Sequence, residues 1–142
     1  MQRFLEWHAK DFMTRNVVTV EPEVALAQLE ALFGRHDFNA FPVVEGERVL
    51  GVVTKFDFLK AFVFTTKEVV PRYGDLMRRA VRDVMTADIV HVQPETPLTR
   101  VLERMIEMKA RSFPVLDAGR KLAGIISRED LMRALRQSTG AA

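Results

Sequence analysis

Residues 41–57 read FPVVEGERVLGVVTKFD, and residues 113–130 read FPVLDAGRKLAGIISRED. Each stretch contains two short apolar runs separated by a turn that holds glycine and an acidic residue. β-Branched residues favour strands, and a glycine-containing turn between two such runs favours a hairpin. Each stretch ends on Thr or Ser followed three positions later by aspartate, which is typical of a helix start. The chain thus contains two copies of one predicted unit, a hairpin followed by a helix.

The duplication extends upstream of the hairpins. Met13-Thr14 recurs as Met85-Thr86, and Pro22-Glu23 recurs as Pro94-Glu95, in each case 72 positions later. The Phe-Pro-Val motifs have the same offset, and one extra residue lies in the turn of the second hairpin. A constant offset across three motifs in the same order indicates duplication of a whole structural unit.

Each copy begins with a short β-branched run closed by a proline, and an amphipathic stripe follows it. The predicted order is therefore strand, helix, strand, strand, helix, and the fold class is α+β. A unit of about 50 residues buries too little surface alone, so we expect the two β-α-β-β-α units to pack through their sheets with pseudo-two-fold symmetry. The predicted ranges are 17–20, 26–34, 41–44, 49–54 and 56–64 in the first copy, and 89–92, 98–108, 113–116, 122–127 and 128–136 in the second.

The remaining segments complete the predicted domain organisation. Apolar residues at helical spacing predict a helix at the start of the chain, and Pro71 and Gly74 indicate a linker between the copies. The expected domains are an N-terminal helix over 1–9, repeat domains over 10–65 and 81–137, a linker with a helix over 66–80, and a disordered tail over 138–142.

The composition is typical of a soluble globular chain: 48% of its 142 residues are hydrophobic, 28% are charged, and none is cysteine. The lack of cysteine excludes disulfides and thiolate-metal sites. Lysine and arginine total 21 against 19 acidic residues, and this near balance argues against nucleic acid as a partner. The longest uncharged apolar stretch, residues 61–66, is too short to span a bilayer, so we expect no membrane contact and a cytoplasmic location.

The sequence contains no local signature of catalysis. It has no phosphate-binding Gly-x-x-x-x-Gly-Lys-Ser/Thr loop, no Gly-x-Ser-x-Gly elbow and no His-Glu-x-x-His motif. The three histidines, His8, His36 and His91, lie in unrelated segments. We therefore predict no catalytic residue, no metal site and no enzymatic activity.

Thr54-x-x-Asp57 and Ser127-x-x-Asp130 have two interpretations. A hydroxyl at a helix N-cap with an acid three residues later forms a capping box, which is a structural device. A helix N-terminus also presents free N–H groups and partial positive charge that suit a phosphate. A carboxylate one turn into the helix can accept both hydroxyls of a ribose. The pattern alone leaves both interpretations open.

Basic residues flank both motifs. Lys55 and Arg128 directly follow the two hydroxyl residues and would attract a phosphate, or would be ordinary solvated cations. Arg111, shortly before the second Phe-Pro-Val, can reach a phosphate as well. Phe56 stands where the second copy has Glu129, and an acid beside a polyphosphate is unfavourable. The first motif is therefore predicted to suit a nucleotide better than the second.

The ordered set of motifs resembles the cystathionine-β-synthase (CBS) domain, and two copies in tandem resemble a Bateman module. The resemblance covers residues 10–64 and 81–135 and rests on Met-Thr, Val-x-Val-x-Pro, an amphipathic helix, Phe-Pro-Val, a glycine-containing strand and Thr/Ser-x-x-Asp. It implies a regulatory protein that binds AMP, ADP, ATP or S-adenosylmethionine in the cleft between the repeats, with no other cofactor. It also implies a flat homodimer formed through the helices, and a separate effector protein that responds to the ligand.

The resemblance also implies roles for individual residues. The aspartates would hold the ribose diol, the Thr and Ser would lie on the phosphate side, and the Phe-Pro-Val strands with one upstream valine per copy would line an adenine slot. His91, in place of Thr19, would lie beside the second slot. The candidate ligand residues are Val18, Phe41, Pro42, Val43, Thr54, Lys55 and Asp57 in the first copy, and Val90, His91, Arg111, Phe113, Pro114, Val115, Ser127, Arg128 and Asp130 in the second.

The alternative function comes from a different class. A module that has kept the fold and lost its ligand would act as a structural or dimerisation unit. In that case the two aspartates would be helix caps alone.

Overall fold

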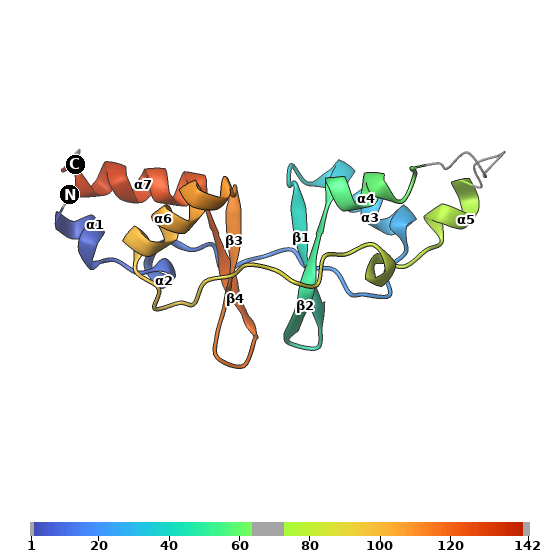
Figure 1. Cartoon of the computed structure of the whole chain (residues 1–142), viewed down its shortest axis with the longest axis horizontal. Helices are drawn as coiled ribbons and strands as arrows, with labels where there is room; N and C mark the ends of the chain where they lie inside the picture. The colour runs from blue at the N-terminus through green and yellow to red at the C-terminus, as the bar shows by residue number, and fades with distance from the viewer. Residues whose placement is uncertain (1, 64–72, 141–142) are drawn as a thin grey trace. The chain divides into compact units, whose positions relative to one another are not determined.

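The computed structural model of the chain describes residues 2–63 and 73–140. Each repeat contains a helix, a two-stranded hairpin and a closing helix (Figure 1). The predicted α+β class is therefore confirmed. The first repeat consists of α3 (Leu26–Arg35), β1 (Ala40–Glu45), β2 (Arg48–Thr54) and α4 (Lys55–Lys60), and the second of α6 (Leu98–Met108), β3 (Ser112–Leu116), β4 (Leu122–Ser127) and α7 (Arg128–Ser138).

The two hairpins have equivalent registers. β1 pairs antiparallel with β2, which places Phe41 opposite Val53, and β3 pairs antiparallel with β4, which places Phe113 opposite Ile126. Both pairings shift register directly after the valine of the Phe-Pro-Val motif. The first turn holds Gly46 at φ 65°, a left-handed conformation that glycine adopts without the steric cost of a Cβ. A shared irregularity of register is what duplication of one unit predicts.

The opening strands predicted over residues 17–20 and 89–92 are wrong in extent, because each reduces to a single bridge. In the first copy the N–H of Val20 donates to the carbonyl of Pro42 at 3.0 Å, and Val92 repeats this with the proline of the second copy. To extend each parallel pairing by one more step towards the N-terminus, the proline that accepts this bond would also have to donate an N–H. Proline has no N–H to donate. The ladder therefore extends over one residue only.

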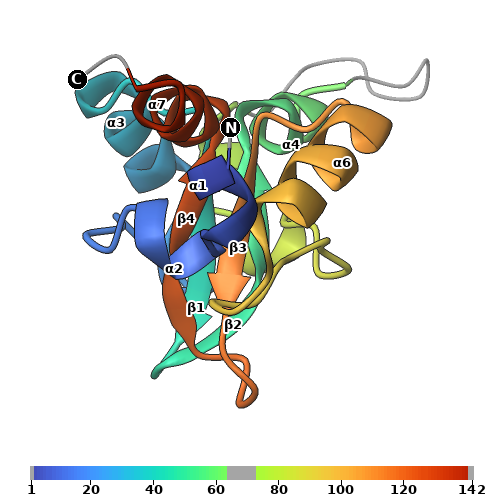
Figure 2. The same cartoon turned by 90° about the vertical axis from the view of Figure 1, so that its left-hand side faces the viewer.

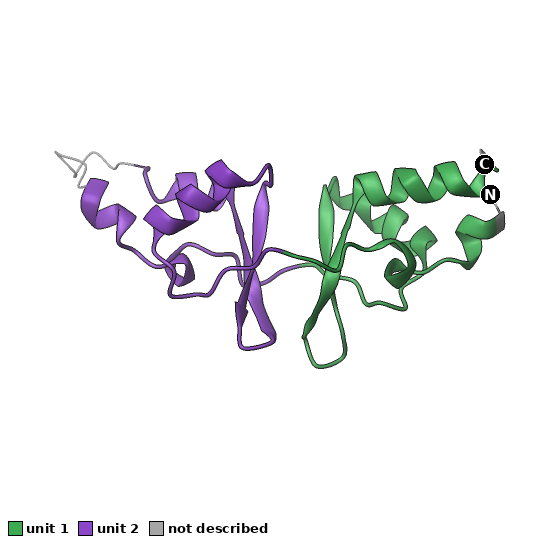
Figure 3. Ribbon diagram, turned by 180° about the vertical axis from the view of Figure 1, so that it is seen from behind, with its two compact units in different colours: residues 1–17, 90–142 green, residues 18–89 purple. Residues whose placement is uncertain are grey.

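The chain folds into two compact units (Figure 3). Unit 1 consists of residues 1–17 and 90–142, and unit 2 consists of residues 18–89. The predicted repeat domains, 10–65 and 81–137, follow the duplication in the sequence instead. The units and the repeats differ because each unit contains the leading segment of the other repeat.

The Met-Thr motifs form this exchange. Thr86 pairs antiparallel with Val52 of β2 through two backbone hydrogen bonds of 2.8 and 2.9 Å. Thr14 pairs in the same way with Ile125 of β4, also at 2.8 and 2.9 Å. Each hairpin thus also pairs with a backbone segment that comes from the other repeat.

One glycine in each hairpin allows this close approach. A Cβ at Gly51 would overlap the carbonyl oxygen of Thr86, and a Cβ at Gly124 would lie 2.6 Å from the carbonyl oxygen of Thr14. Glycine in a strand often marks a place where another backbone comes close. Gly51 and Gly124, which occupy equivalent positions in the two repeats, therefore make room for the Met-Thr backbone.

Each unit has its own hydrophobic core between its hairpin and its helices. Large apolar side chains from the Phe-Pro-Val strand are fully or nearly fully buried in both. The core of unit 1 contains Phe4, Ala9, Phe12, Met13, Val92, Leu98, Val101, Met105, Phe113, Val115, Ile126, Leu131 and Ala134, and that of unit 2 contains Val20, Leu26, Leu29, Phe41, Val43, Val53 and Val81.

Two short helices, α1 (Gln2–Glu6) and α2 (Ala9–Phe12), occupy the start of the chain, where one helix over residues 1–9 is expected. The helix is interrupted because His8 forms an antiparallel bridge with Pro97. α1 contacts both α6 and α7, and Figure 2 shows it between them. The N-terminal segment is therefore part of the packing of unit 1.

The end of the chain is also more ordered than expected. α7 continues through Ser138, which the sequence places at the start of a disordered tail over residues 138–142. Ser138 is buried, and its Oγ accepts a hydrogen bond from the N–H of Phe4 at 3.0 Å. This long-range contact joins the last turn of α7 to α1. Residues 141–142 lie outside the described residues.

Residues 64–72, at the start of the segment between the repeats, lie outside the described residues. They include the last residue of the closing helix predicted over 56–64 and part of the linker predicted over 66–80. α5 (Tyr73–Met77) and a 3-10 turn (Val81–Asp83) follow. The closing helix of the first repeat, α4, ends at Lys60. After it, backbone hydrogen bonds between residues three apart continue as far as residue 63.

Arg82 joins this segment to the rest of unit 2. Its guanidinium contacts the carboxylates of Glu23 at 2.8 Å and Glu45 at 3.2 Å. The hydrogen bond and charge of Glu23, followed by those of Glu45, raise the pKa of Arg82 above its ordinary value. Arg82 therefore stays fully charged in this contact.

Candidate functional site

The Thr54 motif forms a complete capping box at the start of α4. Thr54 Oγ1 accepts from the N–H of Asp57 at 2.9 Å, and Asp57 Oδ2 accepts from the N–H of Thr54 at 3.0 Å. The capping interpretation of this motif is confirmed. Only 3% of Asp57 is exposed, yet its carboxylate has two further partners. Lys60 Nζ lies 3.0 Å from Oδ1, and the hydroxyl of Thr86 donates to Oδ1 at 3.2 Å and to Oδ2 at 3.4 Å.

The Ser127 motif forms the equivalent box at the start of α7. Ser127 Oγ accepts from the N–H of Asp130 at 3.3 Å, and Asp130 Oδ2 accepts from the N–H of Ser127 at 2.8 Å. The same Ser127 hydroxyl lies 3.0 Å from Oδ2 and donates to it, and Arg133 pairs with Oδ1 at 3.2 Å. Asp130 is 4% exposed. Both units therefore hold a buried carboxylate rigidly at a helix start.

The two basic residues beside these motifs have different environments. Lys55 is exposed, and its Nζ lies 5.9 Å from the centre of the Phe33 ring, within cation-π distance. Arg128 instead donates to the carbonyls of Ala110 at 2.9 Å and Lys109 at 3.1 Å. Lys109 ends α6 in the left-handed conformation, at φ 53°. Arg128 therefore satisfies carbonyls at the C-terminal end of α6, where a cation is favourable.

Replacement of Arg128 by glutamine is expected to lower the free energy of unfolding by about 1 kcal/mol, because it removes charged hydrogen bonds to a helix end. Thermal unfolding followed by circular dichroism measures this. Arg111→Gln is the matched control, since Arg111 is exposed, and we expect a change within about 0.5 kcal/mol. Equal unfolding temperatures for the two variants would show that the Arg128 contact does not stabilise the protein.

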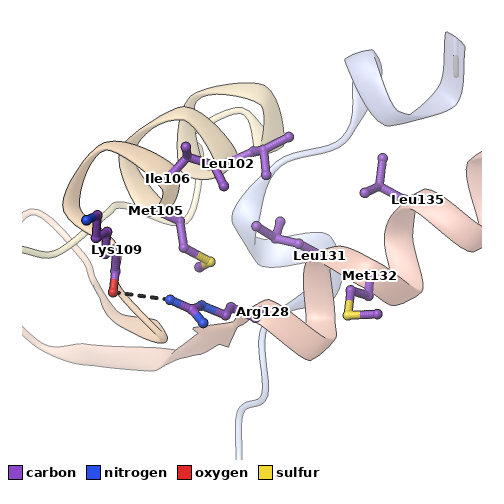
Figure 4. Close-up of a pocket in the computed structure, with 8 residues that line it drawn as sticks. All are labelled: Leu102, Met105, Ile106, Lys109, Arg128, Leu131, Met132 and Leu135. Carbon is purple, nitrogen blue, oxygen red and sulfur yellow. Dashed lines mark hydrogen bonds between the residues drawn. The ribbon is translucent and has the colours of Figure 1, made fainter.

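An apolar groove of about 410 Å³ lies between α6 and α7 of unit 1 (Figure 4). Of the candidate ligand residues only Arg128 lines it, and Figure 4 shows its guanidinium bonded to the Lys109 carbonyl. No carboxylate is among its lining residues, which are Leu102, Met105, Ile106, Lys109, Arg128, Leu131, Met132 and Leu135. The groove is thus a feature separate from the buried aspartates.

The Phe-Pro-Val side chains belong mainly to the cores. Phe41 and Val43 are fully buried in unit 2, and Phe113 and Val115 are buried in unit 1. The carbonyl of each Phe-Pro-Val proline is also in use, because it accepts from Val20 or Val92. The core interpretation of these side chains is confirmed. Pro42 is buried as well, so only the strand backbone and the half-buried ring of Pro114 remain for an adenine slot.

The other candidate residues lie closer to the surface. Val18 and Val90 are half-buried at the edges of the two cores. His91 is half-buried and its carbonyl accepts from Arg104 at 3.3 Å, while Arg111 is exposed. All candidates of the first copy lie in unit 2 and all those of the second lie in unit 1. Each unit therefore contains one complete candidate set.

Sequence reasoning missed three residues that contact the aspartates: Lys60, Arg133 and Thr86. Lys60 and Arg133 each follow the aspartate by three residues in a helix, a spacing at which side chains meet, so this signal was available. Thr86 lies 29 residues from Asp57, and no local pattern predicts which repeat its motif will pack against.

The described residues 2–63 and 73–140 contain no group of three or more His, Cys, Asp or Glu side chains placed to hold a metal ion. Among these residues there is also no helix of the length and apolarity that crossing a membrane requires.

Comparisons with known proteins agree with this architecture. The family model of the CBS domain matches residues 9–64 and 81–137. An A-adding tRNA nucleotidyltransferase of Geobacter sulfurreducens is 27% identical over 131 residues, which make up 92% of this chain and 14% of that enzyme.

Solved structures share the fold over nearly the whole chain. CBSX2, a CBS-pair protein from Arabidopsis thaliana, is 28% identical with a TM-score of 0.81, over 96% of this chain and 99% of that one. In complex with AMP, CBSX2 matches with a TM-score of 0.80, over 94% and 98% of the two chains. The CBS domain pair of MJ0100, solved with 5′-methylthioadenosine and S-adenosyl-L-methionine, is 20% identical with a TM-score of 0.71, over 93% and 98%.

The two regions matched by the family model correspond to the two repeats and together cover most of the sequence. The hairpins, capping boxes and helices described above recur in both regions. The chain belongs to the CBS domain family, in which it is a tandem pair of CBS domains.

Proposed function

We propose that this CBS pair is a regulatory module that binds an adenosine-containing ligand, with AMP as the first candidate and ADP, ATP and S-adenosylmethionine as the others. The observation that carries the proposal is a buried aspartate held at a helix start in each unit, in a chain 28% identical to a CBS-pair protein solved with AMP. A carboxylate accepts hydrogen bonds only, so it suits the two hydroxyls of a ribose.

In this proposal Asp57 and Asp130 each accept the ribose diol. Both carboxylates are already oriented by a backbone N–H, so a ligand finds them preorganised. Thr54 and Ser127 lie on the phosphate side, and exposed Lys55 is free to contact a phosphate in unit 2. In unit 1 this charge would come from Arg111, because Arg128 is bonded to the end of α6.

The remaining roles are part of the same proposal. The module acts without catalysis, in the cytoplasm and as a homodimer, and passes the ligand state to an effector protein. Exposed apolar residues on the helices, such as Ile106, Met132 and Leu59, are candidates for the dimer contact. Ligand binding can change the dimer or the effector only if its affinity differs between two states of the module.

A second candidate is a structural or dimerisation module without a ligand. The observation that favours it is the pair of complete capping boxes, since these alone account for the buried aspartates. The two functions differ in one measurable property, which is the affinity for adenosine compounds.

Calorimetric titration of AMP, ADP, ATP and S-adenosylmethionine into the protein tests the proposal. We expect micromolar affinity for at least one ligand, and a decrease of about tenfold or more per site in Asp57→Asn and Asp130→Asn, because hydrogen bonds to a charged group are lost. Asparagine retains an oxygen for the N-cap contact, so both variants should stay folded.

Asp37→Asn makes the same chemical change at an exposed position of unit 2 and is expected to leave binding unchanged. Circular dichroism verifies the fold of all three variants. If no adenosine compound binds at millimolar concentration, the aspartates are caps only and the module without a ligand is the correct function.

A further inference from the structure

We propose that Thr86, which comes from the second repeat, is a specificity residue of the Asp57 site because its hydroxyl competes with a ribose diol for the Asp57 carboxylate. This inference rests on the proposed function, since it concerns the same ligand site. It makes the two sites of the chain unequal for a reason that lies outside the Thr/Ser-x-x-Asp motifs.

The argument begins with the capacity of the carboxylate. An ionised aspartate offers about four lone-pair positions to hydrogen-bond donors. In Asp57 the N–H of Thr54 occupies one on Oδ2, Lys60 occupies one on Oδ1, and the bifurcated contact of Thr86 reaches both oxygens. A ribose diol, which donates two hydrogen bonds, therefore has to displace existing donors.

The three donors differ in how easily they leave. The Thr54 N–H belongs to the capping box and is fixed by the backbone. Lys60 is half exposed, so its flexible side chain can turn the amine into solvent when a ribose hydroxyl takes its place on Oδ1 of the buried Asp57. The hydroxyl of Thr86 contacts both carboxylate oxygens, the two atoms that a vicinal diol would engage. Thr86 is thus the direct competitor of the ligand.

Among the described residues of unit 1, no hydroxyl reaches both carboxylate oxygens of Asp130. Thr14 occupies the same position in its repeat and forms the same backbone pair, with Ile125. Within the described part of the chain, however, its hydroxyl makes no hydrogen bond to Asp130. The third donor there is the hydroxyl of Ser127, which binds Oδ2 alone at 3.0 Å and leaves Oδ1 to Arg133.

The competition acts through the side chain of Thr86 only. The backbone of Thr86 is held by its two hydrogen bonds to Val52, while the residue is exposed to solvent. Its hydroxyl can therefore rotate from Asp57 to water without moving the segment. Displacing the Thr86 hydroxyl from Asp57 costs free energy, which lowers the affinity for a ribose diol. A sugar with only one hydroxyl displaces less of the Thr86–Asp57 contact, so its affinity is lowered less.

The test uses Thr86→Val in an Asp130→Asn background, so that binding reports on Asp57. AMP and 2′-deoxy-AMP are titrated calorimetrically. Loss of one competing hydrogen bond is expected to raise the affinity for AMP about three- to tenfold and that for 2′-deoxy-AMP by a smaller factor. The unfolding temperature should fall at the same time, because the Thr86 contact is lost. A purely structural role would lower both the stability and the affinity.

Two controls complete the experiment. Thr14→Val removes the equivalent hydroxyl of unit 1 and is expected to leave both affinities unchanged, and Thr86→Ser keeps a hydroxyl and should behave as the parent. The outcomes separate the two proposals. If the Asp130→Asn parent binds AMP, and Thr86→Val leaves the ratio of the AMP and 2′-deoxy-AMP affinities unchanged, the proposed function stands and the role of Thr86 is overturned. If wild-type protein binds no AMP, both are overturned. If wild-type protein binds AMP but the Asp130→Asn parent does not, Asp57 holds no ribose and the role of Thr86 is overturned.

Discussion

A Gly51→Val variant is expected to lose about 3 kcal/mol of folding free energy, because extra atoms in a packed region force backbone shifts. The first atom of the new side chain would overlap the carbonyl oxygen of Thr86. That carbonyl accepts from the N–H of Val52 at 2.9 Å, so it cannot move away without breaking the bridge. A loss of this size is a large part of the stability of a small domain.

Thermal and urea unfolding followed by circular dichroism measure the effect. Gly34→Val is the matched control, because Gly34 is exposed near the end of α3 and a Cβ there would meet no atom within 4 Å. We expect the control to change stability by less than about 0.5 kcal/mol. Equal unfolding midpoints for the two variants would contradict the packing role of Gly51.

A Val81→Asp variant is expected to unfold unit 2. Val81 is fully buried in the core of that unit, and its N–H donates to the carbonyl of Val24 at 2.8 Å. An unpaired carboxylate in an apolar core costs several kcal/mol. Val81 lies just before Met85-Thr86 of the second repeat. Unfolding of unit 2 in this variant would therefore also show that a segment outside the first repeat completes the core around the first hairpin.

Hydrogen exchange measured by mass spectrometry locates the damage. Protection should be lost first within residues 18–63 and 73–89, which belong to unit 2. Val63→Asp is the control, because the Val63 side chain is 71% exposed, and it should unfold as wild type. Exchange that instead rises first in residues 90–140 would show that Val81 supports the other unit.

Much of this fold is readable from local sequence because the interactions that form it are local. The hairpins depend on β-branched runs around a short turn, and the boxes at Thr54 and Ser127 join residues three apart. The tandem order of the motifs likewise identifies the family, which the family model confirms. The duplicated glycines are visible in the sequence, although their purpose is not.

The features missed by the sequence analysis are those that depend on partners distant along the chain. The opening strands stop after one bridge because the proline that lacks the necessary N–H lies in another strand. Arg128 is a cation beside a phosphate motif in the sequence, whereas in the fold it bonds carbonyls at the end of α6. In each case a nonlocal neighbour decides what the residue does.

The sequence by itself determined the two repeats, their secondary structure and the two capping boxes, because hydrophobic period, turn residues and cap spacing act over a few residues. Only the tertiary structure decided that each Met-Thr motif packs against the hairpin of the other repeat. Two similar hairpins are available to each motif, and chain connectivity and packing select between them. That selection brings Thr86 to Asp57 and thereby makes the two carboxylates different.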